Sequence, residues 1–150
     1  METKMTQIII ETKHKLINFH QLISAVKAKG RQSRAVTKFG KLLTKKLAEL
    51  QEDEKELIAR FFEVTEDGNA KKDDEGNLVL LDDAILEDYD ADWDDLHDES
   101  VVIDLTEYHP YLTHLISGLL DWDQELSGAD TVIYDELLDL LEEIETKDAE

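Results

Sequence analysis

The chain is 150 residues long, contains no cysteine and carries a net charge of −21 at pH 7. Its length fits about one domain with its own hydrophobic core, and the lack of cysteine excludes disulfides and thiolate metal sites. Residues 1–60 hold 13 Lys and Arg against 7 Asp and Glu, whereas residues 61–150 hold 3 against 30. We expect one domain over residues 1–150, with a basic helical part at about 1–62 and an acidic part at about 63–150.

Two helices are predicted in the first sixty residues. Apolar residues recur at intervals of three and four from about Glu11 to Lys29, and the preceding Gln7 to Ile10 either extends this helix or forms a short strand. Gly30 is expected to end the first helix and Ser33 to cap the second. The second helix continues to about Phe62 without a proline, and at about 1.5 Å per residue it forms a rod on the order of 45 Å long.

The middle of the chain combines turn signals with the most acidic tract. Asp67-Gly68-Asn69 and Glu75-Gly76-Asn77 each join a conformationally permissive glycine to an asparagine. With Val64 and Leu78 to Leu81, these turns predict either a small hairpin or a mobile loop. Asp82 to Glu99 follows, and the sequence leaves open whether this tract is ordered in the free protein.

One strand and two helices are predicted in the last third. Val101 to Leu105 has the β-branched content of a strand. Pro110 fits the first turn of a helix from about Tyr111 to Leu126, and a final helix runs from about Ala129 to Glu145. The predicted fold class is therefore mainly α (α+β), with a long central helix packed with shorter helices and a small β-hairpin or strand element.

The start of the chain predicts a soluble, unprocessed protein. Residues 1–5 lead into three consecutive isoleucines, which are too few for a secretory core and far short of the roughly 20 apolar residues that span a bilayer. The net negative charge opposes approach to nucleic-acid phosphates and to an anionic leaflet. We therefore expect neither nucleic acid nor a membrane as a direct partner.

The chain shows no motif for catalysis or metal binding. Asp90, Asp92 and Asp94 alternate like the first ligands of a calcium loop, but Asp95 stands where the loop needs glycine and Val101 where it needs glutamate. The histidines lack zinc spacing, and there is no phosphate-binding glycine loop, nucleophile elbow or cysteine nucleophile. We expect a protein that is not an enzyme and has no cofactor or metal.

The acidic tract is the candidate partner-binding site. Twelve acids and no Lys or Arg occur over residues 82–107, and in a helix this gives one charge per roughly 3.3 Å, close to the roughly 3.4 Å per phosphate of one DNA strand. The alternative is a flexible acidic loop whose tryptophans anchor the core. The expected partner-binding residues are Asp82, Asp83, Glu87, Asp88, Asp90, Asp92, Trp93, Asp94, Asp95, Asp98 and Glu99.

The basic tract allows two interpretations. Residues 27–46 contain eight Lys and Arg and no acid. Four of them share one face of the long helix: Arg34, Lys38, Lys41 and Lys45. Either this face contacts phosphates, or it lies against the chain's own acidic half and lowers its self-repulsion. The second interpretation is favoured because the acids far outnumber the bases.

Residues 33–81 carry a resemblance to a known family. The resemblance rests on the paired glycine turns and on the run SRAVTKFGKLLTKKLAELQEDEKELIARFFEVTEDGNAKKDDEGNLVL. This segment resembles an uncharacterised protein family encoded by tailed phages and prophages of Gram-positive bacteria, whose members share a long charged helix and such turns. The resemblance offers no catalytic residues and implies a small phage protein that acts in the cytoplasm of a bacterial host cell.

Charge and resemblance together predict a phage-encoded acidic inhibitor. It would mimic nucleic-acid phosphates and bind the positive channel of a basic host defence protein, such as a restriction enzyme or a CRISPR effector. The alternative is a non-enzymatic phage assembly or tail-associated protein, monomeric or homodimeric, whose acidity keeps it soluble. A third hypothesis is a basic-helix nucleic-acid binder regulated by its acidic half.

Overall fold

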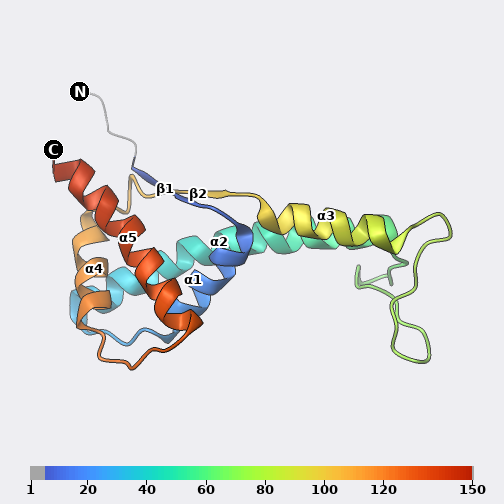
Figure 1. Cartoon of the computed structure of the whole chain (residues 1–150), viewed down its shortest axis with the longest axis horizontal. Helices are drawn as coiled ribbons and strands as arrows, with labels where there is room; N and C mark the ends of the chain where they lie inside the picture. The colour runs from blue at the N-terminus through green and yellow to red at the C-terminus, as the bar shows by residue number, and fades with distance from the viewer. Residues whose placement is uncertain (1–5, 150) are drawn as a thin grey trace.

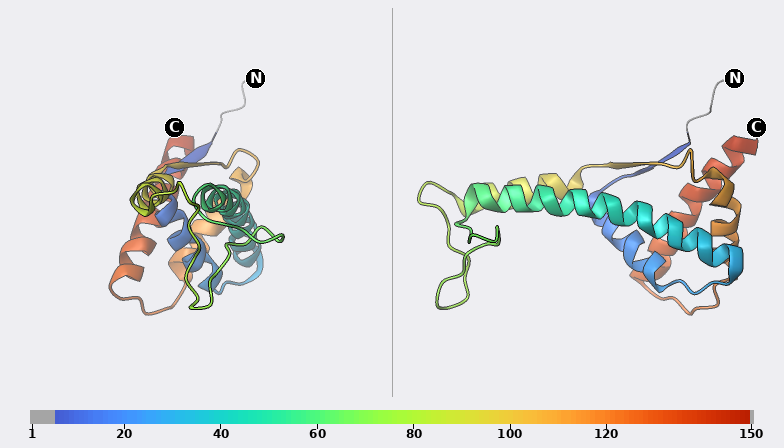
Figure 2. Two further views of the ribbon diagram at one scale, coloured as in Figure 1. Left: turned by 90° about the vertical axis from the view of Figure 1, so that its right-hand side faces the viewer. Right: turned by 180° about the vertical axis from the view of Figure 1, so that it is seen from behind.

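The protein consists of a helical head and a two-helix arm that projects from it (Figure 1). The computed structural model describes residues 6–149, with side chains for residues 6–146. The expectation of an unprocessed start concerns residues 1–5, which lie outside this range. One long helix runs through head and arm, as the view from behind in Figure 2 shows. The predicted fold class, mainly α with a long central helix, shorter helices packed on it and a minor β element, is confirmed.

The long helix α2 (Gly30–Phe61) is the axis of the molecule. Its apolar stripe faces inward along nearly the whole length, and six of its residues are buried: Ala35, Val36, Phe39, Leu43, Leu50 and Leu57. The helix ends where the backbone of Phe62 becomes extended, at φ −125° and ψ 153°. Both the length and the end of this helix follow the sequence prediction.

The start of α2 differs from the prediction. Four residues separate it from helix α1 (Lys13–Ala25), because the backbone turns extended at Val26, with φ −68° and ψ 129°. Gly30 therefore opens α2 instead of ending α1, and its φ of 54° is a conformation that glycine adopts at little cost. The Ser33 amide already donates to the Lys29 carbonyl at 3.3 Å, so Ser33 lies inside the first turn and is not the cap.

The head closes around the first half of α2. Helix α4 (Leu112–Asp121) packs on α2, and helix α5 (Ala129–Ala149) packs on α1 and α4. The Tyr108 hydroxyl donates to the Ala35 carbonyl at 2.6 Å, which ties the segment before α4 to α2. The core of the head is contributed by all of these helices and by the strands, and its most fully buried side chains include Ile10, Phe19, Phe39, Leu43, Leu105, Leu115, Leu137 and Leu141.

The helix predicted from Tyr111 to Leu126 is shorter in the structure. A 3₁₀ turn at His109–Tyr111 precedes α4, as the proline predicts. The helix then stops at Asp121, because Trp122 adopts extended backbone and its ring packs 6.2 Å from that of Tyr134 on α5. Packing between α4 and α5 therefore overrides the local helical pattern.

A two-stranded antiparallel sheet joins the start of the described chain to the segment that follows α3. Strand β1 (Gln7–Ile10) pairs with strand β2 (Val101–Asp104), which decides between the two alternatives for residues 7–10. Ile8 and Ile103 are partners and are both buried. Side chains alternate between the two faces of a strand, so the neighbouring pair is exposed on the outer face.

The tip of the arm, residues 62–85, is a paired structure and resembles the predicted hairpin more than the predicted mobile loop. Its two turns each contain a glycine in the left-handed region, Gly68 at φ 82° and Gly76 at φ 84°. These turns separate three short extended segments. Each segment forms one bridge with each of the others: Phe62 with Leu80, Val64 with Ala70, and Lys72 with Leu78.

The acidic tract is ordered as helix α3 (Leu86–Asp98), which packs along the second half of α2. The two helices lie side by side in Figure 1 and in both views of Figure 2. Within residues 6–149, no helix is both long enough and apolar enough to cross a bilayer.

We expect Phe39→Ala to lower the free energy of unfolding by about 3 to 5 kcal/mol, because it removes buried apolar surface and leaves a cavity. The Phe39 side chain is 0% exposed. Urea unfolding followed by circular dichroism measures the change. Leu120→Ala, on a side chain that is 59% exposed, is the control, and it should change stability by less than about 0.5 kcal/mol. Equal effects of the two substitutions would contradict the packing of the head.

Candidate functional site

A ladder of aromatic rings holds α3 against α2. Tyr89, Trp93 and His97 lie four residues apart on the inner face of α3. Their neighbouring ring centroids are 5.8 Å and 4.5 Å apart. Phe62 meets Tyr89 edge-on at 4.8 Å at the tip end, and His14 of α1 stacks on His97 at 5.2 Å at the head end. The ladder therefore connects tip, arm and head, and it decides which faces of α3 remain in solvent.

His97 is the rung at which the arm meets the head. Its side chain is 3% exposed. The Nδ1 atom lies 2.7 Å from the Trp93 carbonyl oxygen, and Nε2 lies 3.1 Å from a carboxylate oxygen of Glu54 on α2. The contact between His97 and Glu54 joins α3 to α2 beneath the exposed acids.

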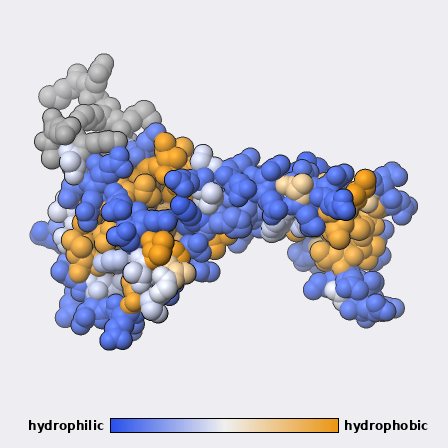
Figure 3. Space-filling model, viewed as in Figure 1, coloured by the Kyte–Doolittle hydropathy of each residue, from blue (hydrophilic) through white to orange (hydrophobic). Residues whose placement is uncertain are grey.

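The solvent-facing sides of α3 carry carboxylates that have no cationic partner. All ten predicted acidic residues are exposed, and the arm between head and tip is predominantly hydrophilic in Figure 3. Among the residues that the structure describes, no salt bridge uses a carboxylate of α3 itself. The seven acids of the helix are Glu87, Asp88, Asp90, Asp92, Asp94, Asp95 and Asp98.

The acids of α3 are dense along the helix axis. Thirteen residues with seven carboxylates give one charge per about 2.8 Å, compared with roughly 3.4 Å per phosphate of one DNA strand. Asp82 and Asp83 lie in the turn before the helix, and Glu99 follows it and pairs with Lys13 at 2.8 Å. Trp93 is half-buried in the ladder, so its ring faces the inside of the arm.

The second half of α2 adds acids that the sequence analysis assigned to the basic part of the chain. A groove of about 410 Å³ runs between α2 and α3. Arg60 is the one cation among the residues that line it. Its carboxylates are Asp53 and Glu56 from α2, Asp92 and Asp95 from α3, and Glu99 beyond the end of α3. The signal for this contribution was the acid-rich stretch at residues 49–56, which a division of the chain at residue 60 obscures.

The basic tract does not neutralise the acidic half. Within the described part of the chain, residues 27–46 form one ion pair, between Lys46 and Glu49 on the same helix at 3.5 Å. Arg34 and Lys38 lie instead over the ring of Tyr111, at 5.9 Å and 5.1 Å from its centroid. The tract therefore lies against residues 108–121 of the acidic half, as the favoured interpretation expects, but among the described residues it forms no salt bridge with that half. The long rod of α2 places the tract in the head and the acidic helix at its opposite end (Figure 1).

The alternating aspartates do not converge. In an α-helix, residues two apart are rotated by about 200° around the axis, so Asp92 points away from the side that Asp90 and Asp94 share. Over the described residues, no group of three or more His, Asp or Glu is arranged to hold a metal ion.

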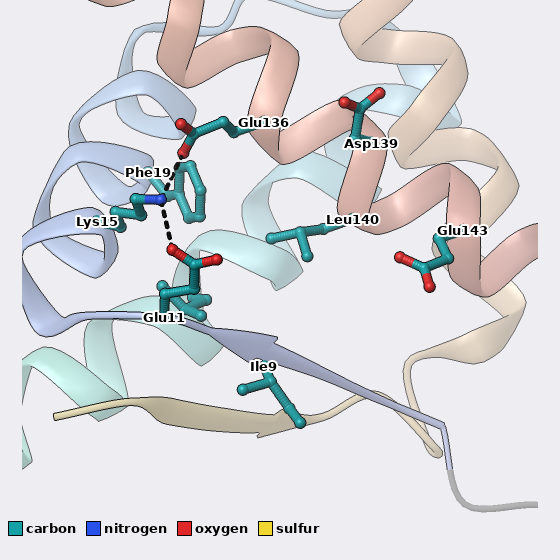
Figure 4. A pocket seen from close by; sticks show the side chains of 9 residues that line it. Ile9, Glu11, Lys15, Phe19, Glu136, Asp139, Leu140 and Glu143 are labelled. Atoms are coloured by element: carbon teal, nitrogen blue, oxygen red, sulfur yellow. Dashed lines mark hydrogen bonds and ion pairs between the residues drawn. The ribbon is translucent and has the colours of Figure 1, made fainter.

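A hollow of about 280 Å³ in the head lies between β1, α1 and α5 (Figure 4). The Lys15 ammonium spans it, 2.9 Å from Glu11 and 3.3 Å from Glu136. Hydrogen bonds to Glu11 first and Glu136 second raise the pKa of Lys15. The stabilisation of the fold by these two ion pairs is therefore fully present below the unfolded pKa of Lys15, 10.5, and it is lost as the pH rises through the higher pKa of Lys15 in the folded protein. The ion pair between Lys15 and Glu136 across this hollow holds α5 against α1.

A known protein family matches the whole part of the chain that the structure describes. A family model described as "Protein of unknown function (DUF1617)" matches residues 6–149. The match covers head, arm and tip, which is more of the chain than the segment 33–81 on which the sequence resemblance rested. No curated protein and no solved structure matches the chain. The family description contains no activity and no source, so the function has to be argued from the arm.

We expect His97→Ala to loosen the arm while the head stays intact. The substitution removes the rung that joins the ladder to the head and leaves Glu54 without its partner, which costs about 1 to 3 kcal/mol. Hydrogen–deuterium exchange followed by mass spectrometry should show faster exchange in α3 and unchanged exchange in α4. Asp94→Asn, on the exposed side of α3, is the control and should leave both helices as protected as before. Unchanged protection of α3 in His97→Ala would contradict this role.

Proposed function

The chain belongs to the family described as protein of unknown function (DUF1617), and we propose that it is a phage-encoded acidic inhibitor whose arm occupies the cationic nucleic-acid channel of a host defence protein. One observation carries this proposal. Seven exposed carboxylates lie on α3, none of them in a salt bridge with a residue that the structure describes, on a rod that stands clear of the head.

The charge pattern of the arm matches what such a channel binds. Lys and Arg side chains that neutralise phosphates also pair with carboxylates, and Arg binds a carboxylate through two parallel hydrogen bonds. Residues 49–61 and 86–99 together hold thirteen Asp and Glu against two Lys and Arg. A cationic channel that accepts this rod gains ion pairs that the free protein does not have, and nucleic acid is then excluded by competition.

The acidic groove between α2 and α3 gives this mode of binding a specific geometry. Carboxylates from both helices line it, and Leu57 and Leu96 form its apolar base. A partner arginine that enters the groove would place its guanidinium between two rows of carboxylates and its methylene groups on the leucines. Recruitment would be fast and strongly salt-dependent, because long-range attraction steers oppositely charged surfaces together.

The second candidate function is phage assembly or association with the tail. It is favoured by one feature that a purely electrostatic inhibitor does not need, a cluster of exposed apolar side chains at the tip of the arm. A permanent structural partner would cover such a cluster. Detection of the protein in purified phage particles, together with failure to capture any nucleic-acid-binding protein, would support this candidate over the inhibitor.

We expect the protein, used as bait in a bacterial lysate, to retain basic nucleic-acid-binding proteins at about 0.05 M salt and to release them at about 0.5 M, because screening shortens the range of the attraction. Mass spectrometry identifies the retained proteins, and added DNA should compete with the bait. Equal retention at both salt concentrations would count against the proposal.

Neutralising the arm should weaken binding to a protein captured in this way. We expect the combined change of Asp90, Asp92, Asp94 and Asp95 to Asn to lower the affinity by about tenfold to a hundredfold at low salt and to flatten its salt dependence. The matched control neutralises four exposed acids of α5, which changes the net charge equally: Asp130, Asp135, Asp139 and Glu142. If both quadruple variants bind alike, net charge alone matters and the arm is not the site.

A further inference from the structure

The tip of the arm exposes an apolar patch. Ten large hydrophobic side chains are exposed among the described residues, and six of them belong to residues 64–86. Figure 3 shows apolar surface gathered at the end of the arm, beyond the hydrophilic stretch that separates it from the head. The six residues of this apolar patch are Val64, Leu78, Leu80, Leu81, Ile85 and Leu86.

The apolar patch is held by backbone hydrogen bonds. The amide of Glu63 donates to the carbonyl of Val79 at 2.8 Å, and the amide of Lys71 donates to the carbonyl of Glu63 at 2.8 Å. Phe62 beneath it is buried and packs on Tyr89 of the aromatic ladder. The side chains of the patch are therefore presented on a fixed support, which lowers the entropy cost of binding through them.

Charge around the apolar patch selects its occupant. Residues 63–88 contain ten Asp and Glu against two Lys. A second copy of the chain would bring an equally acidic rim against this one, and an anionic membrane would repel it. An apolar pocket bordered by Lys and Arg on another protein would match this surface. The pocket would bury the apolar patch, and its Lys and Arg would pair with the acidic residues around the patch.

We propose that the tip inserts into an apolar pocket rimmed by Lys and Arg on the partner protein and so fixes where the acidic arm lies. The proposal rests on the proposed function for the sign of the partner's charge and adds the element that positions the arm. The carboxylates of α3 give affinity that falls with salt, whereas burial of the apolar patch gives affinity that persists at high salt. The two contributions are therefore separable in one titration.

The test uses the full chain and two dye-labelled peptides with equal numbers of lysines, an amphipathic Lys/Leu helix and an oligolysine. Fluorescence anisotropy measures binding at several salt concentrations. We expect the Lys/Leu peptide to bind at least about tenfold more tightly than oligolysine, because it alone can bury the apolar patch. The double variant Ile85→Ser with Leu86→Ser should abolish this difference and leave oligolysine binding and its salt dependence unchanged.

The matched control replaces two equally exposed apolar side chains of the head. Ile85 and Leu86 are 57% and 49% exposed, and Leu120 and Val132 are 59% and 57% exposed. Leu120→Ser with Val132→Ser should retain the full preference for the Lys/Leu peptide. Circular dichroism and urea unfolding verify that both double variants fold.

Each remaining outcome overturns a defined part of the proposal. Equal binding of the two peptides by the unaltered chain overturns the role of the tip and leaves the acidic arm in place. If neither peptide binds, the proposed function fails together with the partner chemistry inferred from it. Sedimentation velocity that shows a dimer lost in the tip variant would assign the apolar patch to a second copy. Binding to phosphatidylcholine vesicles that is lost in the same variant would assign it to lipid.

Discussion

The arm depends on the aromatic ladder between α3 and the second half of α2. Residues 49–61 and 86–99 carry thirteen acids and two cations, so the mutual repulsion of these segments opposes pairing. α3 has one buried residue, His97, and it therefore lacks the wide apolar face that normally holds a helix. Ring contacts from Phe62 to His14 and the hydrogen-bonding contact of His97 with Glu54 supply the attraction instead. The aromatic ladder inside the arm therefore holds the acidic surface of α3 in a fixed position on α2.

The rod of α2 also separates the basic tract from the acidic helix α3. Its first half carries the basic tract into the head, where Arg34 and Lys38 lie over Tyr111, and its second half carries acids into the arm. A compact arrangement would have brought the opposite charges together and neutralised many of them. Because the helix is long, the basic tract lies far from α3, and the acids of α3 form no salt bridge with any residue that the structure describes.

The three parts of the molecule have different relations to solvent, and these relations agree with the division of function that we propose. The head buries its apolar side chains in a core cluster and is held further by pairs such as Lys15 with Glu136. The arm exposes carboxylates, and the tip exposes the apolar patch. Exposed apolar surface on an ordered support marks an interaction site more often than a defect of folding, and here it lies at the outermost end of the most acidic part of the chain.

The sequence by itself determined the features that repeat within one turn or one helix. The apolar spacing of residues 36–57 specifies α2, and the glycines at 68 and 76 specify two turns. The acids of residues 82–99 predict a charged surface. Only the tertiary structure decided the partners of these elements: β1 with the distant β2, α3 with the acidic half of α2, and the ladder through Trp93 and His97. The reason is physical, because helical and turn patterns arise from contacts between near neighbours in the chain. Which surfaces meet depends on the free energy of packing among many distant alternatives, and a local pattern does not record it.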